Sequence, residues 1–240
     1  MNDIWNKEEL WKSKKFSYAK AYKNIFLEFD FNASINILEI GVNKTAGMYL
    51  YKQIFPNSNI CGIDINPNTP HSEVGRVWIG NEIDGKLLDT ISEEEGPFDL
   101  IVDDGSHLQD HQIIIFEHMF PLLNPGGIYV CEDVHTSYHE RYQNEDKFFG
   151  RKPLNETVDN ESFIDYSKRL VDLINFNAWG KGYQNPRTYE WVTNATDLKK
   201  YNSYNIDEKI YKSINFISFY PSIVAFHKSN YDNEFQHVKN

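Results

Sequence analysis

One segment, residues 98–138, constrains the fold more than any other part of the chain, because it predicts a strand, a helix and a second strand in succession. Residues 98–102 form an apolar run, and residues 107–123 carry apolar side chains at helical spacing. A Pro-Gly-Gly turn then precedes a second apolar run at 128–131. Two strands joined through a helix are expected to be parallel neighbours, so both should end at the same edge of one sheet.

Four carboxylates and two histidines gather where these two strands are expected to end. The carboxyl edge of an open α/β sheet is where such folds bind their ligands, so a functional site is expected there. The residues of this edge are Asp103, Asp104, His107, Glu132, Asp133 and His135.

The remainder of the chain alternates strands with helices, which predicts an α/β fold with a doubly wound, mostly parallel sheet. Two apolar runs on either side of Pro221 predict a closing hairpin, so seven strands with an antiparallel last strand are expected. The other expected elements are one or two helices at 4–29, strands at 35–41, 59–65 and 76–79, helices from Thr45, at 84–91 and from Asn160, and the paired strands at 213–220 and 222–228.

Composition excludes several classes of function. A net charge of −11 and a pI near 5.2 predict no nucleic-acid partner, since phosphate binding needs a basic face. The chain has no apolar run of about 18 residues, so no membrane span and no signal segment are expected. Cys61 and Cys131 lie within apolar strand runs, which suits buried thiols in a reducing compartment, and the cytoplasm is the expected location.

The first strand ends in Glu39 and is followed by Gly41, a pattern typical of a nucleotide-type ligand at the first strand-to-helix turn. Asp64 closes the next strand, where it is placed to accept hydrogen bonds from two ribose hydroxyls. NAD and S-adenosylmethionine fit this pattern equally. The three-glycine dinucleotide fingerprint is absent, and an acidic pocket suits a positively charged sulfonium, so S-adenosylmethionine is favoured.

Four motifs resemble those of the class I S-adenosylmethionine-dependent methyltransferases: ILEIG, GIDINP, FDLIVDDGSH and LLNPGGIYVCEDVHTSY. Within that class the chain is most similar to the metal-dependent sugar O-methyltransferases of macrolide and aminocoumarin antibiotic biosynthesis, of the mycinamicin and tylosin type. The resemblance covers residues 35–138, with weaker support at 14–22. It implies a Rossmann-like fold and methyl transfer from S-adenosylmethionine to a sugar hydroxyl.

The resemblance also implies roles for individual residues. His107 matches the general base of the family. Residues 134–159 directly follow the expected metal ligands, so they are interpreted as a lid or acceptor wall, in which His135, Tyr138 and Arg141 are the candidate substrate contacts. The metal ligands are expected to be Asp104, Glu132 and Asp133, and the cofactor contacts Glu39, Gly41, Thr45, Asp64 and Asp103.

On this interpretation the whole chain, residues 1–240, is one methyltransferase domain. A second irregular insertion, at 176–207, joins 134–159 in forming the acceptor side. The parts of the domain are N-terminal helices at 1–34, a cofactor- and metal-binding core at 35–133, lid and acceptor insertions at 134–207 and the terminal strand pair at 208–228.

The chemistry of these side chains supports the resemblance independently. Three converging carboxylates without cysteine favour a hard cation such as Mg²⁺. A sugar hydroxyl is a poor nucleophile at neutral pH, and Mg²⁺ lowers the pKa of a hydroxyl that it binds. His107 follows Asp104 by three residues, so it is expected to remove the proton.

Three positions depart from the pattern of the family. Thr45 begins the segment that replaces a Gly-Gly-Ser run, and it is expected to cap the following helix and to offer its N–H to the cofactor. Residues 80–84 replace a GDQSD-like segment on the adenine side. His139 stands where the family has tryptophan, beside the acceptor loop.

Other interpretations remain open. Asp103 and Asp104 could cap the following helix, and His107 with His111 has the spacing of a zinc pair. An NAD-dependent oxidoreductase on the same sheet and a non-catalytic binder of cofactor or glycan are the alternative functions. For the main function a nucleotide-linked or glycan-borne sugar is the preferred acceptor, because the insertion at 134–159 is basic at Arg141, Arg151 and Lys152. Aromatic residues near the N-terminus point to an interface, so a homodimer is also considered.

Overall fold

The centre of the molecule is a seven-stranded sheet. The computed structural model describes residues 4–11, 14, 16–139, 142, 161–179, 183–184, 191–192 and 206–230. The strands of the sheet are β1 (Asn36–Ile40), β2 (Asn59–Asp64), β3 (Gly75–Ile79), β4 (Phe98–Asp103), β5 (Leu123–Glu132), β8 (Ile214–Tyr220) and β9 (Ile223–Lys228).

The strands follow the order β3-β2-β1-β4-β5-β9-β8 across the sheet. The first five run parallel, whereas β9 runs antiparallel to both β5 and β8. The predicted mostly parallel, Rossmann-like sheet with an antiparallel last strand is therefore confirmed. Since β1, β4 and β5 are parallel neighbours, the residues that follow them meet at one carboxyl edge.

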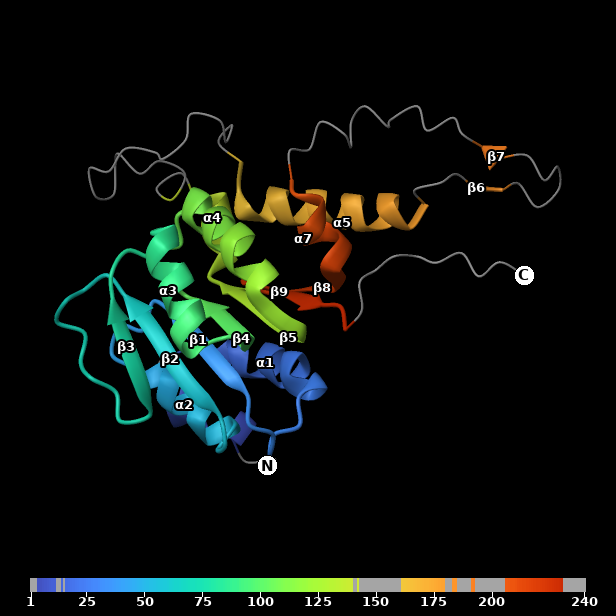
Figure 1. Cartoon of the computed structure of the whole chain (residues 1–240). Coiled ribbons are helices and arrows are strands. Elements are labelled where there is room, and N and C mark those ends of the chain that lie inside the picture. Colours follow the sequence, from blue (N-terminus) through green and yellow to red (C-terminus); the bar gives the residue numbers. More distant parts are fainter. Residues whose placement is uncertain are drawn as a thin grey trace.

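Helices cover both faces of the sheet (Figure 1). One face, called here the N-terminal face, packs against α1 (Ala19–Ile25) and α2 (Ala46–Ile54). The opposite face, called here the α4 face, packs against α3 (Gly85–Glu95), α4 (Gln109–Met119), α5 (Phe163–Trp179) and α7 (Glu208–Ser213).

Short elements complete the described chain. Two of them, β6 (Tyr183–Gln184) and β7 (Trp191–Val192), pair as a separate antiparallel sheet. The 3-10 helices are η1 (Ile4–Asn6), η2 (Glu8–Trp11), η3 (Phe16–Tyr18), η4 (Phe26–Glu28), η5 (Phe120–Leu122) and η6 (Val134–Tyr138).

Several predicted boundaries were wrong. The described residues of the segment 4–29 form mainly 3-10 turns around the short α1, because their aromatic side chains pack in a cluster rather than along one amphipathic stripe. The predicted helix at 107–123 is α4 followed by η5, and β5 already begins before the Pro-Gly-Gly turn, with a bulge against β4. The insertion at 176–207 contains the end of α5 together with β6 and β7, and α7 was not predicted.

Side chains along each strand alternate between the two faces, and this decides which acidic residues can meet. In β4, Val102 packs on the N-terminal face and Ile101 on the α4 face. Asp103 therefore continues the row of Ile101. In β5 and β1, Glu132 follows the row of Val130 and Glu39 follows that of Ile37, both on the N-terminal face.

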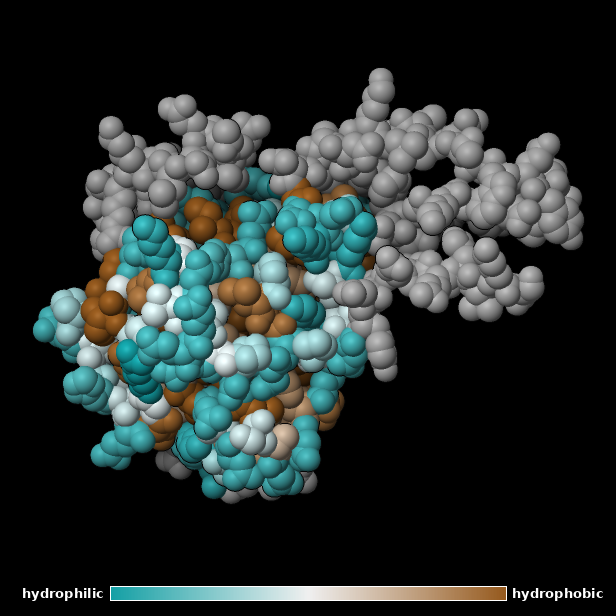
Figure 2. Space-filling view, viewed as in Figure 1, coloured by the Kyte–Doolittle hydropathy of each residue, from teal (hydrophilic) through white to brown (hydrophobic). Residues whose placement is uncertain are grey.

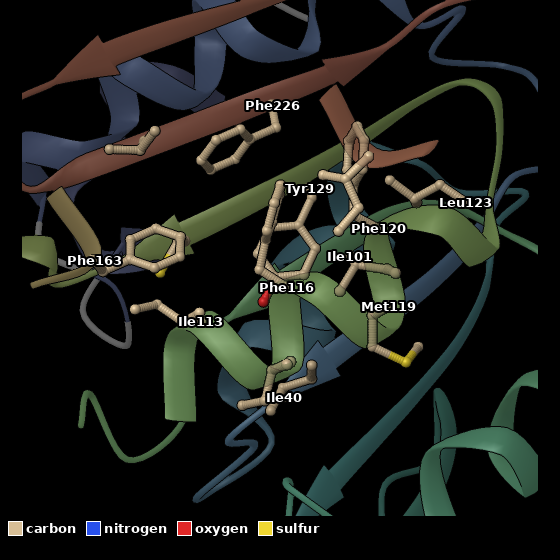
Figure 3. Close-up of a cluster of buried hydrophobic side chains, with 14 of the residues drawn as sticks. Ile40, Ile101, Ile113, Phe116, Met119, Phe120, Leu123, Tyr129, Phe163 and Phe226 are labelled. Atoms are coloured by element: carbon tan, nitrogen blue, oxygen red, sulfur yellow. The ribbon is translucent and has the colours of Figure 1, made fainter. Parts of the chain in front are cut away.

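Aromatic side chains fill the core of the α4 face (Figure 3). Phe116 from α4 lies at the centre, with its ring centroid 4.3 Å from that of Phe226 and 5.2 Å from that of Tyr129. The side chain of Phe116 is fully buried. This cluster fixes α4 against β5 and β9, and so it sets the position of the loop that precedes α4.

A Phe116→Ala variant is expected to lose about 3–5 kcal/mol of unfolding free energy, because truncation leaves a cavity in this close-packed cluster. Urea unfolding followed by circular dichroism measures the loss. The matched control is Leu27→Ala, since Leu27 is 68% exposed and its truncation should change the free energy by no more than about 0.5 kcal/mol. Equal losses in the two variants would contradict the central role of Phe116.

The face seen in Figure 2 is mostly hydrophilic, and hydrophobic residues appear on it as separate areas. Within the part of the chain that the structure describes, no helix combines the length and the apolar character needed to cross a membrane. Cys61 and Cys131 are both buried free thiols, as expected from their strands.

Candidate functional site at the carboxyl edge

Two aspartates and a histidine converge at the carboxyl edge of the sheet. Asp104 follows β4 and Asp133 follows β5, while His107 lies in the loop before α4. His107 Nε2 is 3.9 Å from Asp104 Oδ1 and 3.9 Å from Asp133 Oδ2. One ligand atom of each residue falls within 4.8 Å of the others, a spacing that could hold a metal ion. All three side chains are about one-fifth exposed, so the group is open to a ligand.

Two residues of this group have a left-handed backbone conformation, which residues other than glycine rarely adopt. His107 has φ 60° and Asp133 has φ 54°. The carbonyl oxygen of His107 accepts hydrogen bonds from Gln109 Nε2 at 3.1 Å and from Thr136 Oγ1 at 3.2 Å, which hold the loop in place. Strained conformations that are held in this way cluster at functional sites, so the geometry favours a functional role. Asp103 and Asp104 do not cap α4, whose N-cap residue is Leu108.

A buried lysine lies against the same carboxylates. Lys14 Nζ is 2.8 Å from Glu39 Oε1, 2.7 Å from Asp104 Oδ2 and 3.3 Å from Glu132 Oε1. Burial alone would lower the pKa of Lys14, but the surrounding carboxylates, Asp104 first, raise it well above the ordinary value. Lys14 is therefore charged, and it offsets part of the negative charge at this edge. Sequence reasoning missed this residue.

Glu132, the third predicted metal ligand, faces these buried partners. Its side chain is 2% exposed, and its Oε1 accepts a hydrogen bond from the Tyr22 hydroxyl in addition to the contact with Lys14. Burial raises the pKa of Glu132 to about 8 in spite of the lysine charge. Among the described residues the metal-spaced group therefore contains Asp104, His107 and Asp133 without Glu132.

A cavity of about 500 Å³ opens beside this group. A Cβ atom at Gly41, which has φ +84°, would lie 2.1 Å from the carbonyl oxygen of Asp104, so only glycine fits where the loops after β1 and β4 approach each other. The cavity is lined by Gly41, Asn43, Asp64, Ile65, Asn66, Asn81, Glu82, Asp104, Gly105, Ser106, His107, Leu108 and His111.

Acidic side chains in the cavity are held by their neighbours. Asp64 accepts hydrogen bonds from the N–H groups of Asn43 at 2.6 Å and Asn66 at 2.8 Å. Glu82 accepts from the Ser106 N–H at 2.9 Å and lies 3.3 Å from His111 Nδ1. Burial would raise the pKa of Glu82, but the hydrogen bonds from His111 and Ser106 outweigh it and lower the pKa. Among the described residues the metal-spaced group contains His107 without His111, whose Nδ1 contacts Glu82.

Three predicted cofactor contacts do not line the cavity. Glu39 is buried against Lys14, and Asp103 is buried on the α4 face, where the Tyr129 hydroxyl donates to its Oδ2 at 2.9 Å. Burial raises the pKa of Asp103 to about 7. Thr45 has φ 62°, caps nothing with its side chain, and donates its N–H to the carbonyl of Val42 at 2.9 Å. The predicted side-chain cap of Thr45 was therefore wrong, whereas its contact with the cofactor stays a prediction.

The predicted substrate contacts lie on the outer side of the site. His135 and Tyr138 belong to η6, and Tyr138 is 77% exposed. His135 Nδ1 is 2.5 Å from Ser222 Oγ, at the turn between β8 and β9. Arg141 lies outside the described residues, as do Arg151 and Lys152.

No protein-family model matches the chain. The chain is 32% identical over 164 residues to the 8-demethyl-8-alpha-L-rhamnosyl tetracenomycin-C 2'-O-methyltransferase of Streptomyces olivaceus, which covers 65% of this chain and 40% of that protein. It is 36% identical over 115 residues to the mycinamicin VI 2''-O-methyltransferase of Micromonospora griseorubida, which covers 45% of this chain and 29% of that protein. The matches thus span less than half the length of these curated relatives.

A solved structure shares the fold. The MycE methyltransferase from the mycinamycin biosynthetic pathway, in complex with Mg, SAH and mycinamycin VI, superposes with a TM-score of 0.69 at 21% identity. The alignment covers 96% of this chain and 56% of that chain. The described sheet and its helices therefore share the fold of that protein.

Proposed function

We propose that this chain is an S-adenosylmethionine-dependent O-methyltransferase that requires a divalent cation and acts on a sugar hydroxyl. The observation that carries the proposal is the convergence of His107 with Asp104 and Asp133 beside an acidic cavity. A protein that only binds a ligand has no need of a histidine held by strained backbone between two carboxylates. Catalysis is therefore favoured over binding alone.

The cavity is the proposed cofactor site. Asp64, Glu82 and Asp104 give its wall a negative charge, which suits a positive sulfonium better than the diphosphate of NAD. Asp64 is proposed to accept hydrogen bonds from the ribose hydroxyls, and Gly41 to admit the cofactor close to the backbone. Asn81 and Glu82 belong to the segment expected to meet the adenine. When bound, S-adenosylmethionine supplies an electrophilic methyl group.

The residues present fit a hard divalent cation. Asp104 and Asp133 offer carboxylate oxygens within one group, which is the donor chemistry that Mg²⁺ prefers. Bound there, Mg²⁺ would supply a Lewis acid that lowers the pKa of the acceptor hydroxyl. Glu132 remains a predicted ligand, and to reach the cation it would have to leave Lys14 and Tyr22.

His107 is proposed as the general base. Its Nε2 faces the aspartates and takes the proton from the acceptor hydroxyl. Two carboxylate oxygens lie 3.9 Å from this nitrogen, one from each aspartate. Its Nδ1 is buried and has no hydrogen-bond partner among the described residues, so the protein fixes this ring through the backbone of the loop.

A sugar is the proposed acceptor because the relative from Streptomyces olivaceus is named as a methyltransferase of a rhamnosyl tetracenomycin. Among sugars, a nucleotide-linked or glycan-borne one is preferred, and η6 with His135 and Tyr138 is the proposed contact surface. A cytoplasmic location and a homodimer remain predictions.

Chelation tests the proposal. The protein is incubated with S-adenosylmethionine and a panel of rhamnosyl and nucleotide-linked sugars, and S-adenosylhomocysteine and methylated product are measured by mass spectrometry. EDTA is expected to abolish both products, and excess Mg²⁺ to restore them, because the acceptor hydroxyl then regains its lowered pKa. EDTA that has been loaded with Mg²⁺ beforehand is the matched control and should leave the activity unchanged. Turnover that persists under chelation would contradict the cation requirement.

A further inference from the structure

The carboxylates of the proposed cation site are contacted from behind by side chains of residues 14–22. Lys14 Nζ lies 2.7 Å from Asp104 Oδ2, and the Tyr18 hydroxyl donates a hydrogen bond to Asp133 Oδ1. In both aspartates it is the other oxygen that lies on the side of His107, 3.9 Å from its Nε2. Each carboxylate therefore places one oxygen against a partner from residues 14–22 and directs its other oxygen toward His107.

Both partners are themselves fixed. The side chain of Lys14 is 2% exposed and also pairs with Glu39 at 2.8 Å, so its ammonium cannot follow a rotating Asp104. Tyr18 is 3% exposed, and its hydroxyl oxygen lies 2.9 Å from Ser222 Oγ. A carboxylate that is bound through one oxygen to an immobile partner keeps its plane and therefore the direction of its second oxygen.

The same segment supplies a third contact with the same spacing. Tyr22, four residues after Tyr18 and eight after Lys14, donates its hydroxyl to Glu132 Oε1. Tyr18 and Tyr22 are one helical turn apart at the start of α1, so their hydroxyls project from one side of the segment. Every carboxylate predicted from the sequence to hold the metal thus has at least one partner in residues 14–22.

We infer that Lys14 and Tyr18 are positioning residues of the proposed cation site, which hold Asp104 and Asp133 so that their second oxygens converge with His107. The inference rests on the proposed function, because it assumes that this group binds a divalent cation. Neither residue touches the acceptor or the methyl group in this role. Their effect passes through the two aspartates.

The discrimination between Mg²⁺ and Ca²⁺ reports on such positioning. Mg²⁺ demands near-ideal octahedral geometry at about 2.0–2.1 Å, whereas Ca²⁺ accepts irregular oxygen ligands at about 2.3–2.6 Å. Loss of the lysine charge alters the attraction of both cations alike, because both are divalent. The ratio of the two dissociation constants therefore separates orientation of the ligands from net charge.

The experiment titrates each cation alone, without cofactor or acceptor, into wild-type protein, Lys14→Met and Tyr18→Phe, and follows binding by calorimetry. In both variants the affinity for Mg²⁺ relative to Ca²⁺ is expected to fall by about 10-fold or more, the lower end of the effect of removing residues that orient metal ligands. Tyr18→Phe removes a single oxygen atom and keeps the aromatic ring, so it tests the inference even if Lys14→Met does not fold.

Lys20→Met and Tyr49→Phe are the matched controls, because Lys20 is exposed on α1 and Tyr49 is 38% exposed on α2. Both are expected to keep the wild-type ratio. An unchanged ratio in folded Tyr18→Phe would overturn the inference and leave the proposed function standing. A wild-type protein that binds neither cation would overturn the cation role in the proposed function and, with it, this inference.

Discussion

Replacement of His107 by alanine is expected to lower kcat by about 10²–10⁴-fold, the usual contribution of a positioned general base. The His107 side chain does not belong to either hydrophobic core cluster of the described residues, and its Nε2 faces Asp104 and Asp133. Removal of the ring leaves the acceptor hydroxyl without a group to take its proton. The rate is measured as formation of S-adenosylhomocysteine at saturating cofactor, acceptor and Mg²⁺.

Binding measurements separate this chemical role from a role in the site's architecture. The affinity of the variant for S-adenosylhomocysteine should be close to that of wild type, since the cavity keeps its other lining residues. His118→Ala is the matched control, because His118 pairs with Asp89 on the surface at 2.8 Å and should have no effect on kcat. A His107→Ala enzyme with wild-type kcat would refute the assignment of the base.

The second large effect is expected for Asp133→Asn. The amide removes one negative charge from the proposed cation site and keeps the shape of the side chain. Loss of a residue that merely orients a metal ligand costs about 10–100-fold in affinity, so loss of a ligand charge should cost more than about 100-fold. The dissociation constant of Mn²⁺, measured by electron paramagnetic resonance without cofactor, checks this expectation.

The matched control is Asp89→Asn, an identical change at a side chain that is 59% exposed and belongs to α3 rather than to the metal-spaced group. Its Mn²⁺ affinity should equal that of wild type. Asp104→Asn should resemble Asp133→Asn, because both aspartates contribute to the same group. Wild-type Mn²⁺ affinity in both Asp104→Asn and Asp133→Asn would show that this group is not the cation site.

The sequence was sufficient to predict the sheet and the edge at which the site forms. Strands of five or six mostly apolar residues, separated by helical patterns, allow few topologies when crossovers are right-handed and neighbours are parallel. That rule alone brought Asp104, His107 and Asp133 to one edge. The length of the N-terminal helices could not be predicted in the same way, because aromatic contacts rather than a helical stripe determine that segment.

The direction of the Asp103 side chain follows from a pattern that the sequence already contained. Asp103 and Asp104 are adjacent, so position along the chain makes them equal candidates for a site. The alternation of side chains along β4 distinguishes the two residues. Val102 packs on the N-terminal face, so Asp103 must point to the α4 face, toward Tyr129. The direction of a strand's last residue can be inferred from the faces of the residues before it.

The role of Lys14 could not have been inferred in that manner. Residues 12, 14 and 15 are all lysines, and no local pattern marks Lys14 as the one that becomes buried in this structure. Its partner Asp104 is 90 residues away in sequence, and the contact depends on how the N-terminal segment packs. The only local signal is the four-residue spacing of Lys14, Tyr18 and Tyr22, which is unremarkable without knowledge of the sheet.

The hydroxyl of Tyr18 reaches residues at large sequence separations. Asp133 is 115 positions away and Ser222 is 204 positions away. Contacts between residues so far apart in sequence close long loops, and closing a longer loop costs more chain entropy. The sheet by itself can bring Asp104 and Asp133 to one edge, but their orientation depends on the docking of residues 14–22. Local opening of that segment would therefore release the orientation of Asp104 and Asp133 while the central strands remain paired.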